Sequence, residues 1–257
     1  MTTKILLAND DGYYALGLEK LYEELSKWAE VVVFTPETNH SGASNSLSIN
    51  RPLSLKKSSK GFNIINGTPS DCVHVALTNF LDFVPDIVVS GINNGANLGE
   101  DTLYSGTVAA ATEGYLFGYQ SIAFSLTHYN WPQIDEVANI ASEFVKLIVA
   151  NPTETKTLLS INIPPKESYS LKDFRVTRLG RRHQSQPVER TKSPFGQDLF
   201  WIGASGEIMD FGEDTDFYAV DNGFISVTPI QLDMTHYKKL ESTKAWLEGQ
   251  VNSKVEK

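Results

Sequence analysis

The chain has 257 residues, a length that suits one large α/β domain or one domain with an appendage. Hydrophobic residues make up 41% and charged residues 21%, as in ordinary folded proteins, which argues against intrinsic disorder. The formal net charge of −9 disfavours nonspecific binding to a nucleic-acid backbone or to an anionic membrane. We therefore expect no nucleic-acid duplex and no membrane among the partners.

Two further features concern the cellular setting. The single cysteine, Cys72, excludes an internal disulfide and any zinc site built from several cysteines. No stretch reaches the roughly 18 apolar residues of a membrane span, and the first residues lack the pattern of a signal peptide. Together these features predict a cytoplasmic protein.

The first part of the chain alternates between strand patterns and helix patterns. Apolar and β-branched runs predict strands at 4–9, 31–34, 86–91, 121–126 and 158–163. The spacing of apolar residues predicts helices over 18–28, from about 69, from about 107 and over 134–144. Such alternation is typical of an α/β fold with a Rossmann-like, mostly parallel sheet and helices on both faces.

After about residue 165 the pattern changes, because Gly, Pro and charged residues interrupt shorter apolar stretches. We expect these stretches to be strands of a hairpin-rich extension, at 174–179, 199–203 and 223–230. A final helix is predicted over roughly 235–250. The predicted organisation is therefore a core at 1–165 and an extension at 166–257.

Polar residues gather where three of the predicted parallel strands end. Asn9 to Gly12 follow the first strand, residues 35–46 follow the second, and residues 90–107 follow the strand at 86–91. In a doubly wound sheet, ligands bind outside the carboxyl ends of the strands. This edge of the sheet is thus the predicted position of a functional site.

Asp10 and Asp11 pose an electrostatic problem, because neighbouring carboxylates repel one another and are costly to remove from water without compensation. One of them could cap the next helix while the other stays solvated. However, Gly12 permits a tight turn, and hard oxygen ligands at a strand end suit Mg²⁺, Mn²⁺ or Ca²⁺. A divalent cation would relieve the repulsion.

The glycine-rich stretch 90–107 offers further ligands. Asn93, Asn94 and Asn97 carry amide side chains that can coordinate a cation or hold a phosphate oxygen. Residues 105–107 stand where a helix is predicted to begin, and the unpaired amides of a helix start attract anions. Ser105 can equally serve only as the cap of that helix.

Six distinctive segments span nearly the whole chain: "NDDG" (9–12), "PETNHSGAS" (36–44), "NGTPSDCV" (66–73), "SGINNGANLGEDTLYSGTVAAATEG" (90–114), "SPFG" (193–196) and "GFISVTPI" (223–230). In this order they resemble the SurE family, the stationary-phase survival proteins that act as metal-dependent 5′-nucleotidases. The resemblance implies a Rossmann-like core that hydrolyses nucleoside 5′-monophosphates and a C-terminal extension used to assemble a homodimer or homotetramer.

The resemblance also implies the site residues. The metal ligands of the family, for one divalent cation per subunit, fall on Asp10, Asp11, Ser41 and Asn93. The phosphate-binding residues fall on Asn97, Ser105, Gly106 and Thr107. Asp10 and Asp11 would also be catalytic: one of them orients or deprotonates a water molecule, or itself attacks phosphorus.

The sequence departs from the family pattern at Ala8, where a hydroxyl residue is frequent, and at Asn94, where a larger and often basic side chain is common. Two other readings stay open. One is an aspartyl-phosphate phosphatase of the haloacid dehalogenase type, although its two Asp residues are normally separated by one position. The other is a noncatalytic nucleotide-binding module. Neither the preferred nucleotide nor activity on 3′-nucleotides or polyphosphate follows from the sequence.

Overall fold

The computed structural model describes residues 2–182 and 185–255. The strands are β1 (Lys4–Ala8), β2 (Glu30–Pro36), β3 (Leu55–Lys57), β4 (Asn63–Ile65), β5 (Ile87–Asn94), β6 (Gln120–Leu126), β7 (Leu158–Ile163), β8 (Phe174–Val176), β9 (Glu189–Lys192), β10 (Asp198–Trp201) and β11 (Ile225–Ile230). The α-helices are α1 (Leu16–Ser26), α2 (Pro69–Val75), α3 (Gly106–Leu116), α4 (Ile134–Ala150), α5 (Asp216–Asp221) and α6 (Leu240–Val255). Three short helical turns are η1 (Ala76–Phe80), η2 (Gly99–Leu103) and η3 (Tyr237–Lys239).

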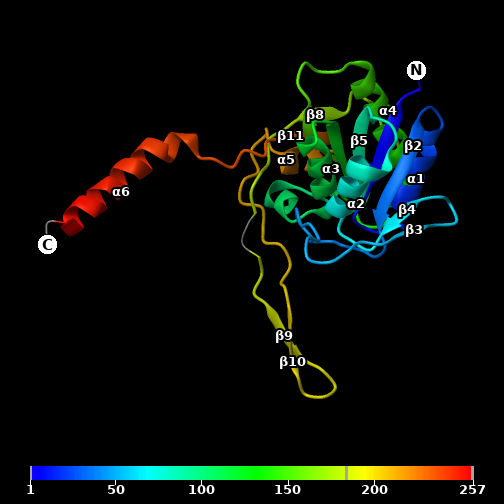
Figure 1. Ribbon diagram of the computed structural model, residues 1–257. Coiled ribbons are helices and arrows are strands. Elements are labelled where there is room, and N and C mark those ends of the chain that lie inside the picture. The colour runs from blue at the N-terminus through cyan, green and yellow to red at the C-terminus, as the bar shows by residue number, and fades with distance from the viewer. Residues whose placement is uncertain (1, 183–184, 256–257) are drawn as a thin grey trace.

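Nine of the described strands form one sheet in the order β3-β4-β2-β1-β5-β6-β7-β11-β8. The strands from β4 to β7 in this order are parallel, β3 is antiparallel to β4, and β11 is antiparallel to β7. The predicted α/β fold with a Rossmann-like, mostly parallel sheet is therefore confirmed, and Figure 1 shows its helices around the sheet.

The side chains of β1 show why the two faces of the sheet are both buried. Successive residues of a strand point to opposite faces, so Ile5 and Leu7 pack in a cluster with residues of α1 and α4. Leu6 and Ala8 pack on the other face with residues of α2 and α3. A strand buried on both faces reads as a continuous apolar run rather than an alternating one, which explains the sequence pattern of 4–9.

Helix α2 begins where the sequence predicts it. The Thr68 hydroxyl accepts a hydrogen bond from the Asp71 backbone N–H at 3.1 Å, and the Asp71 carboxylate accepts one from the Thr68 N–H at 2.8 Å. This reciprocal capping satisfies two backbone donors of the first turn, and Pro69 has no N–H to satisfy there. Cys72 in this helix is fully buried against the sheet and so belongs to the core.

The structure corrects the expected pairing of two late strands. Residues 174–179 and 223–230 were expected in hairpins of an extension, but β11 joins the main sheet beside β7, and β8 pairs with β11 at the edge of that sheet. The reason is that β11 covers the hydrogen-bonding edge of β7 and buries Ile225 and Val227. The division at residue 165 into two domains stays a prediction.

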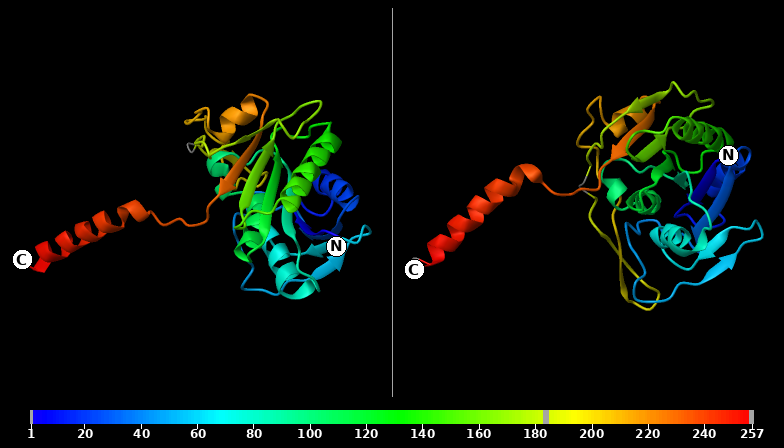
Figure 2. Two further views of the ribbon diagram at one scale, coloured as in Figure 1. Left: turned by 90° about the horizontal axis from the view of Figure 1, so that it is seen from above. Right: turned by 45° about the horizontal axis from the view of Figure 1, so that its top comes forward.

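Two segments project from the body (Figures 1 and 2). Strands β9 and β10 form an antiparallel hairpin at the end of a long arm, and α6 extends away from the sheet. The predicted C-terminal helix is found as η3 and α6, and its apolar residues Leu240, Trp246 and Leu247 are exposed. Across the described residues, no helix has both the length and the apolar character that a membrane crossing needs.

Candidate metal and phosphate site

The candidate site lies at the carboxyl ends of β1 and β5. The chain passes from β1 outward to β2 and β4 on one side, and then returns to β5 on the other side of β1. Such a reversal of strand order opens a crevice at the edge of an α/β sheet. A cavity of about 360 Å³ is found there, and it is lined by five of the eight predicted site residues: Asp10, Ser41, Asn93, Asn97 and Ser105.

Asp10 is buried directly beyond the end of β1, with 3% of its surface exposed. Its Oδ1 accepts a hydrogen bond from the Thr107 hydroxyl, and Gly106 lies against its side chain. A Cβ added at Gly106 would lie 2.7 Å from the Asp10 Cβ and 2.9 Å from its Oδ2. Glycine at this position therefore lets the start of α3 approach Asp10.

The two neighbouring carboxylates are both shifted toward their protonated forms. Burial raises the pKa of Asp10 to about 6, aided by the charge of Asp11 and opposed by the hydrogen bond from Thr107. Burial also raises the pKa of Asp11, although hydrogen bonds from the Asn94 backbone and the Asn39 side chain oppose the shift. In the described part of the chain, neither carboxylate forms an ion pair with a basic side chain.

Asn39 links the first and second loops of the site. Its Nδ2 donates to Asp11 Oδ1 at 3.1 Å, and its Oδ1 accepts from the Ser41 backbone N–H at 2.8 Å. One side chain thus places a predicted carboxylate ligand and a predicted hydroxyl ligand relative to each other. No sequence pattern indicated this role, although Asn39 lies within the segment 36–44 that carries the resemblance.

Asn93 lies near the end of β5, which continues further than the sequence predicted. The strand runs through Asn93 and Asn94, which pair with Ser125 and Leu126 of β6 after an irregularity in register. The Asn93 side-chain NH₂ donates to the Gly95 carbonyl at 2.8 Å. With its amide group oriented in this way, its carbonyl oxygen is the atom that can act as a ligand.

The donor set fits a hard divalent cation. Two carboxylates, a hydroxyl and an amide carbonyl are all oxygen ligands, which Mg²⁺, Mn²⁺ and Ca²⁺ prefer. Among the described residues, no cluster of three or more His, Cys, Asp and Glu side chains has a metal-binding arrangement. A cation here would therefore need the neutral oxygens of Ser41 and Asn93 besides the carboxylates of Asp10 and Asp11, whose charge no basic side chain balances within the described ranges.

The four residues predicted to bind phosphate have different surroundings. Ser105 lines the cavity and also caps α3, since its Oγ accepts from the Val108 N–H at 3.1 Å. Asn97 lines the cavity too, and its Nδ2 donates to Ser125 Oγ at 2.7 Å. Gly106 and Thr107 instead contact Asp10, and Thr107 is fully buried. A phosphate-binding role for the four stays a prediction.

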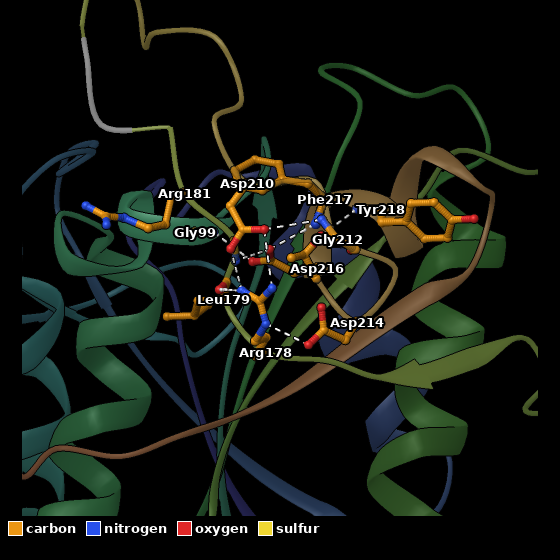
Figure 3. A network of polar contacts seen from close by, with 12 residues as sticks. Gly99, Arg178, Leu179, Arg181, Asp210, Gly212, Asp214, Asp216, Phe217 and Tyr218 are labelled. Carbon is orange, nitrogen blue, oxygen red and sulfur yellow. Dashed lines mark hydrogen bonds and ion pairs between the residues drawn. The ribbon is translucent and has the colours of Figure 1, made fainter.

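A second carboxylate network supports the loop that leads into α3 (Figure 3). Asp216 accepts hydrogen bonds from the backbone N–H groups of Gly99 at 2.7 Å, Gly180 at 2.8 Å and Phe217 at 2.9 Å. Beside it, Arg178 pairs with Asp210 and Asp214 (Figure 3). Gly180 and Asp216 are thereby held against Gly99 at the start of η2. No motif in the sequence indicated this contact.

Comparison with known proteins extends the resemblance to the whole fold. The family model described as "Survival protein SurE" matches residues 5–186. The chain is also similar to the SurE protein of Aquifex aeolicus, whose crystal structure matches with 41% sequence identity and a TM-score of 0.82. That match covers 95% of this chain and 99% of the Aquifex aeolicus chain. The chain belongs to the SurE family.

Proposed function

We propose that this protein is a 5′-nucleotidase, which hydrolyses nucleoside 5′-monophosphates to nucleoside and phosphate with one divalent cation per subunit. Membership of the SurE family suggests a nucleotidase or phosphatase, and the family is generally metal-dependent. The observation that carries the proposal is the buried carboxylate of Asp10 beside the partly buried carboxylate of Asp11, at the point where the strand order of the sheet reverses and next to the start of α3. Neither carboxylate forms an ion pair among the described residues, and burial raises the pKa of both.

The cation would be held by Asp10, Asp11, Ser41 and Asn93. When bound, it would neutralise charge on the phosphate and polarise phosphorus toward attack. The start of α3 offers backbone N–H groups and a partial positive charge to the remaining phosphoryl oxygens. Ser105 and Asn97, which line the same cavity, would add polar contacts.

Water is the proposed nucleophile. Asp10 is fixed by Thr107 and packed against Gly106, and Asp11 is held by Asn39 and by the Asn94 backbone N–H. Carboxylates restrained in this way suit the orientation of a water molecule better than movement toward phosphorus. The haloacid dehalogenase alternative instead requires a covalent aspartyl phosphate. Trapping such an intermediate on Asp10 or Asp11 would favour that alternative.

The test is a phosphate-release assay of the full chain with AMP and with Mg²⁺, Mn²⁺ or Ca²⁺. We expect activity that EDTA abolishes, and a loss of at least about 100-fold in Asp10→Asn and Asp11→Asn with the fold retained, because an amide cannot supply the negative charge. Asp82→Asn, at an exposed position, is the matched control. Near-normal turnover of both site variants would contradict the proposal, and no hydrolysis in any metal would favour the noncatalytic alternative.

The two projecting segments support a homodimer or homotetramer. Trp246 and Leu247 of α6 and Phe200 and Trp201 of the β9–β10 arm are exposed apolar residues, which a second copy of the chain could cover. Light scattering after size exclusion should give the mass of a dimer or tetramer. A monomeric mass at micromolar concentration would contradict this assignment.

A further inference from the structure

A second cavity, of about 310 Å³, opens on the side of Asp11 that faces α1 and α4. It shares Asn93 with the cavity at the metal site and also includes Asp11 in its lining. The two cavities therefore meet at predicted metal ligands. A substrate whose phosphate lies at those ligands can extend the rest of its structure into this second cavity.

The lining of the second cavity is rich in aromatic rings. Tyr14 follows the turn after β1, and Tyr129 and Trp131 come from the loop between β6 and α4. Tyr14 and Tyr129 are 65% and 68% exposed, so their rings are presented to a ligand rather than packed in the core. Planar bases stack on such rings, and any base can do so because each has a π-face.

The polar groups of this cavity are mostly neutral. Amide side chains of Asn39, Asn94 and Asn130 line it, while Asp11, a predicted metal ligand, is its single charged residue among those described. Amides can both donate and accept hydrogen bonds, as the edges of a nucleobase require. The chemistry of the lining therefore fits a neutral planar heterocycle better than a second anionic group.

Asn94 holds the aromatic loop against the metal site. Its Nδ2 donates to Asn130 Oδ1 at 2.9 Å, and its Oδ1 accepts from the Asn130 backbone N–H at 2.8 Å. The backbone N–H of Asn94 donates to Asp11 Oδ2 at 3.1 Å. In addition, the Trp131 Nε1–H is buried without a hydrogen-bond partner among the described residues. A ligand in this cavity would thus meet a loop that is already fastened to the metal site.

A third cavity, of about 520 Å³, is the competing position for the base. It adjoins the metal cavity at Asp101 and Tyr104 and reaches Arg182 and Ile202. Its aromatic lining among the described residues is Tyr104, and Arg182 is already paired with Asp101 at 2.7 Å. The cavity of Tyr14, Tyr129 and Trp131 offers three aromatic rings for stacking, whereas the third cavity offers one. The former is therefore the better position for the base.

We propose that the cavity of Tyr14, Tyr129 and Trp131 binds the nucleobase of the substrate. This inference rests on the proposed 5′-nucleotidase function. The nucleotide would lie across the ends of β1 and β5, where the strand order reverses. Its phosphate would be at the metal ligands and its base on the α1 and α4 side of the sheet. The aromatic rings would then determine the preference for nucleotides over sugar phosphates that lack a base.

The test compares AMP with ribose 5-phosphate in the same divalent cation. Tyr14→Ala and Tyr129→Ala should each raise KM for AMP by roughly 5- to 100-fold, the range expected for loss of one base-stacking contact. KM for ribose 5-phosphate should stay unchanged, because that substrate has no base. Tyr14→Phe and Tyr129→Phe are the matched controls and should keep the KM of the unaltered protein for AMP, since each retains the ring.

Binding is followed separately by tryptophan fluorescence. Adenosine, which has the base but no phosphate, should quench the emission of the full chain in EDTA, and Trp131→Phe should remove that quenching while the other three tryptophans remain. The inference is overturned by unchanged KM for AMP in both alanine variants, by equal changes for both substrates, or by quenching that Trp131→Phe retains. If no phosphate ester is hydrolysed at all, the proposed function fails, and the quenching experiment alone still decides whether this cavity binds the base.

Discussion

Two acidic regions of the molecule use the same residue type in opposite ways. Asp10 is buried and Asp11 is partly buried beyond β1. Neither forms an ion pair among the described residues, and both have raised pKa values because burial disfavours their charged forms. Asp210 and Asp214 lie near the surface and both pair with the Arg178 guanidinium. Asp210 Oδ2 is 2.6 Å from Arg178 Nη1, and Asp214 Oδ2 is 2.7 Å from Arg178 Nε. Hydrogen bonds from Arg178 lower the pKa values of both.

The difference separates structural acids from acids available for a ligand. The charges near Arg178 are already balanced, so a cation would gain little by binding there. Asp10 and Asp11 leave a negative charge that folding places in a poorly solvated site, which makes the folded protein less stable until a cation binds. Asp216 is a third case, buried but satisfied by three backbone N–H groups.

Asp216 gives the largest expected effect on stability. Asp216→Ala would leave the buried N–H groups of Gly99 and Gly180 without acceptors, and it should lower the free energy of unfolding by about 3–5 kcal/mol. Asp216→Asn keeps one acceptor oxygen and should cost roughly half as much. Urea denaturation measures both values, and equal stabilities of the two variants would show that the hydrogen bonds are not the cause.

The pH dependence of stability in EDTA should distinguish Asp10 from the acids near Arg178. The folded pKa of Asp10 is about 6 against an ordinary value of 3.8, so between these values the folded state binds a proton that the unfolded state does not. Lowering the pH from 7 to about 4 should therefore stabilise the protein, by up to about 3 kcal/mol from this group.

Asp10→Asn should remove that gain, and stability should then depend less on pH in this range. Asp210 and Asp214 have lowered pKa values, so they contribute in the opposite direction and lose their stabilising charge below about pH 4. Denaturation midpoints at several pH values provide the measurement. Stability that falls steadily from pH 7 to pH 5 in the unaltered protein would contradict the burial of Asp10.

A divalent cation should stabilise the protein through the first region and not through the second. At 100 times its dissociation constant, a ligand that binds only the folded state adds about 2.7 kcal/mol. The thermal midpoint should rise with Mg²⁺ or Mn²⁺ in the unaltered protein and in Asp210→Asn, but not in Asp10→Asn or Asp11→Asn. An equal rise in all four proteins would place the cation elsewhere.

Arg178 gives the smallest expected effect. Its ion pairs with Asp210 and Asp214 are at the surface, where solvent and salt weaken them. Arg178→Met should therefore lower the free energy of unfolding only slightly, by far less than Asp216→Ala does, and leave phosphate release unchanged. A loss of stability as large as that of Asp216→Ala would mean that this network, like Asp216, is essential to the position of η2.

The sequence predicted the parts of the fold that local patterns determine. Continuous apolar runs located β1, β2, β5, β6 and β7, and the start of α2 was predicted at about residue 69, where the structure has it. Strands β3 and β4 were not predicted, because each has three residues and β3 is exposed. The place of β8 and β11 depends on pairing with a distant edge, which no local pattern contains.

For the candidate site, the sequence indicated which residues gather at one edge of the sheet but not the contacts that hold them there. Asp10, Ser41, Asn93, Asn97 and Ser105 are brought to one cavity, as their positions after parallel strands indicated. The sequence did not reveal that Thr107 hydrogen bonds Asp10, because that contact depends on how closely α3 approaches β1. Nor did it reveal Asp216, whose partner Gly99 is 117 residues away along the chain.

The late covering of β7 by β11 has a consequence for synthesis on the ribosome. Domains begin to fold from the N-terminus as the chain emerges, but the edge of β7 stays unpaired until β11 has been made. The hydrogen bond from Gly99 to Asp216 also forms only after that stretch emerges. A nascent chain that stops near residue 165 therefore has an open strand edge and an unanchored η2 loop, which makes it prone to aggregation.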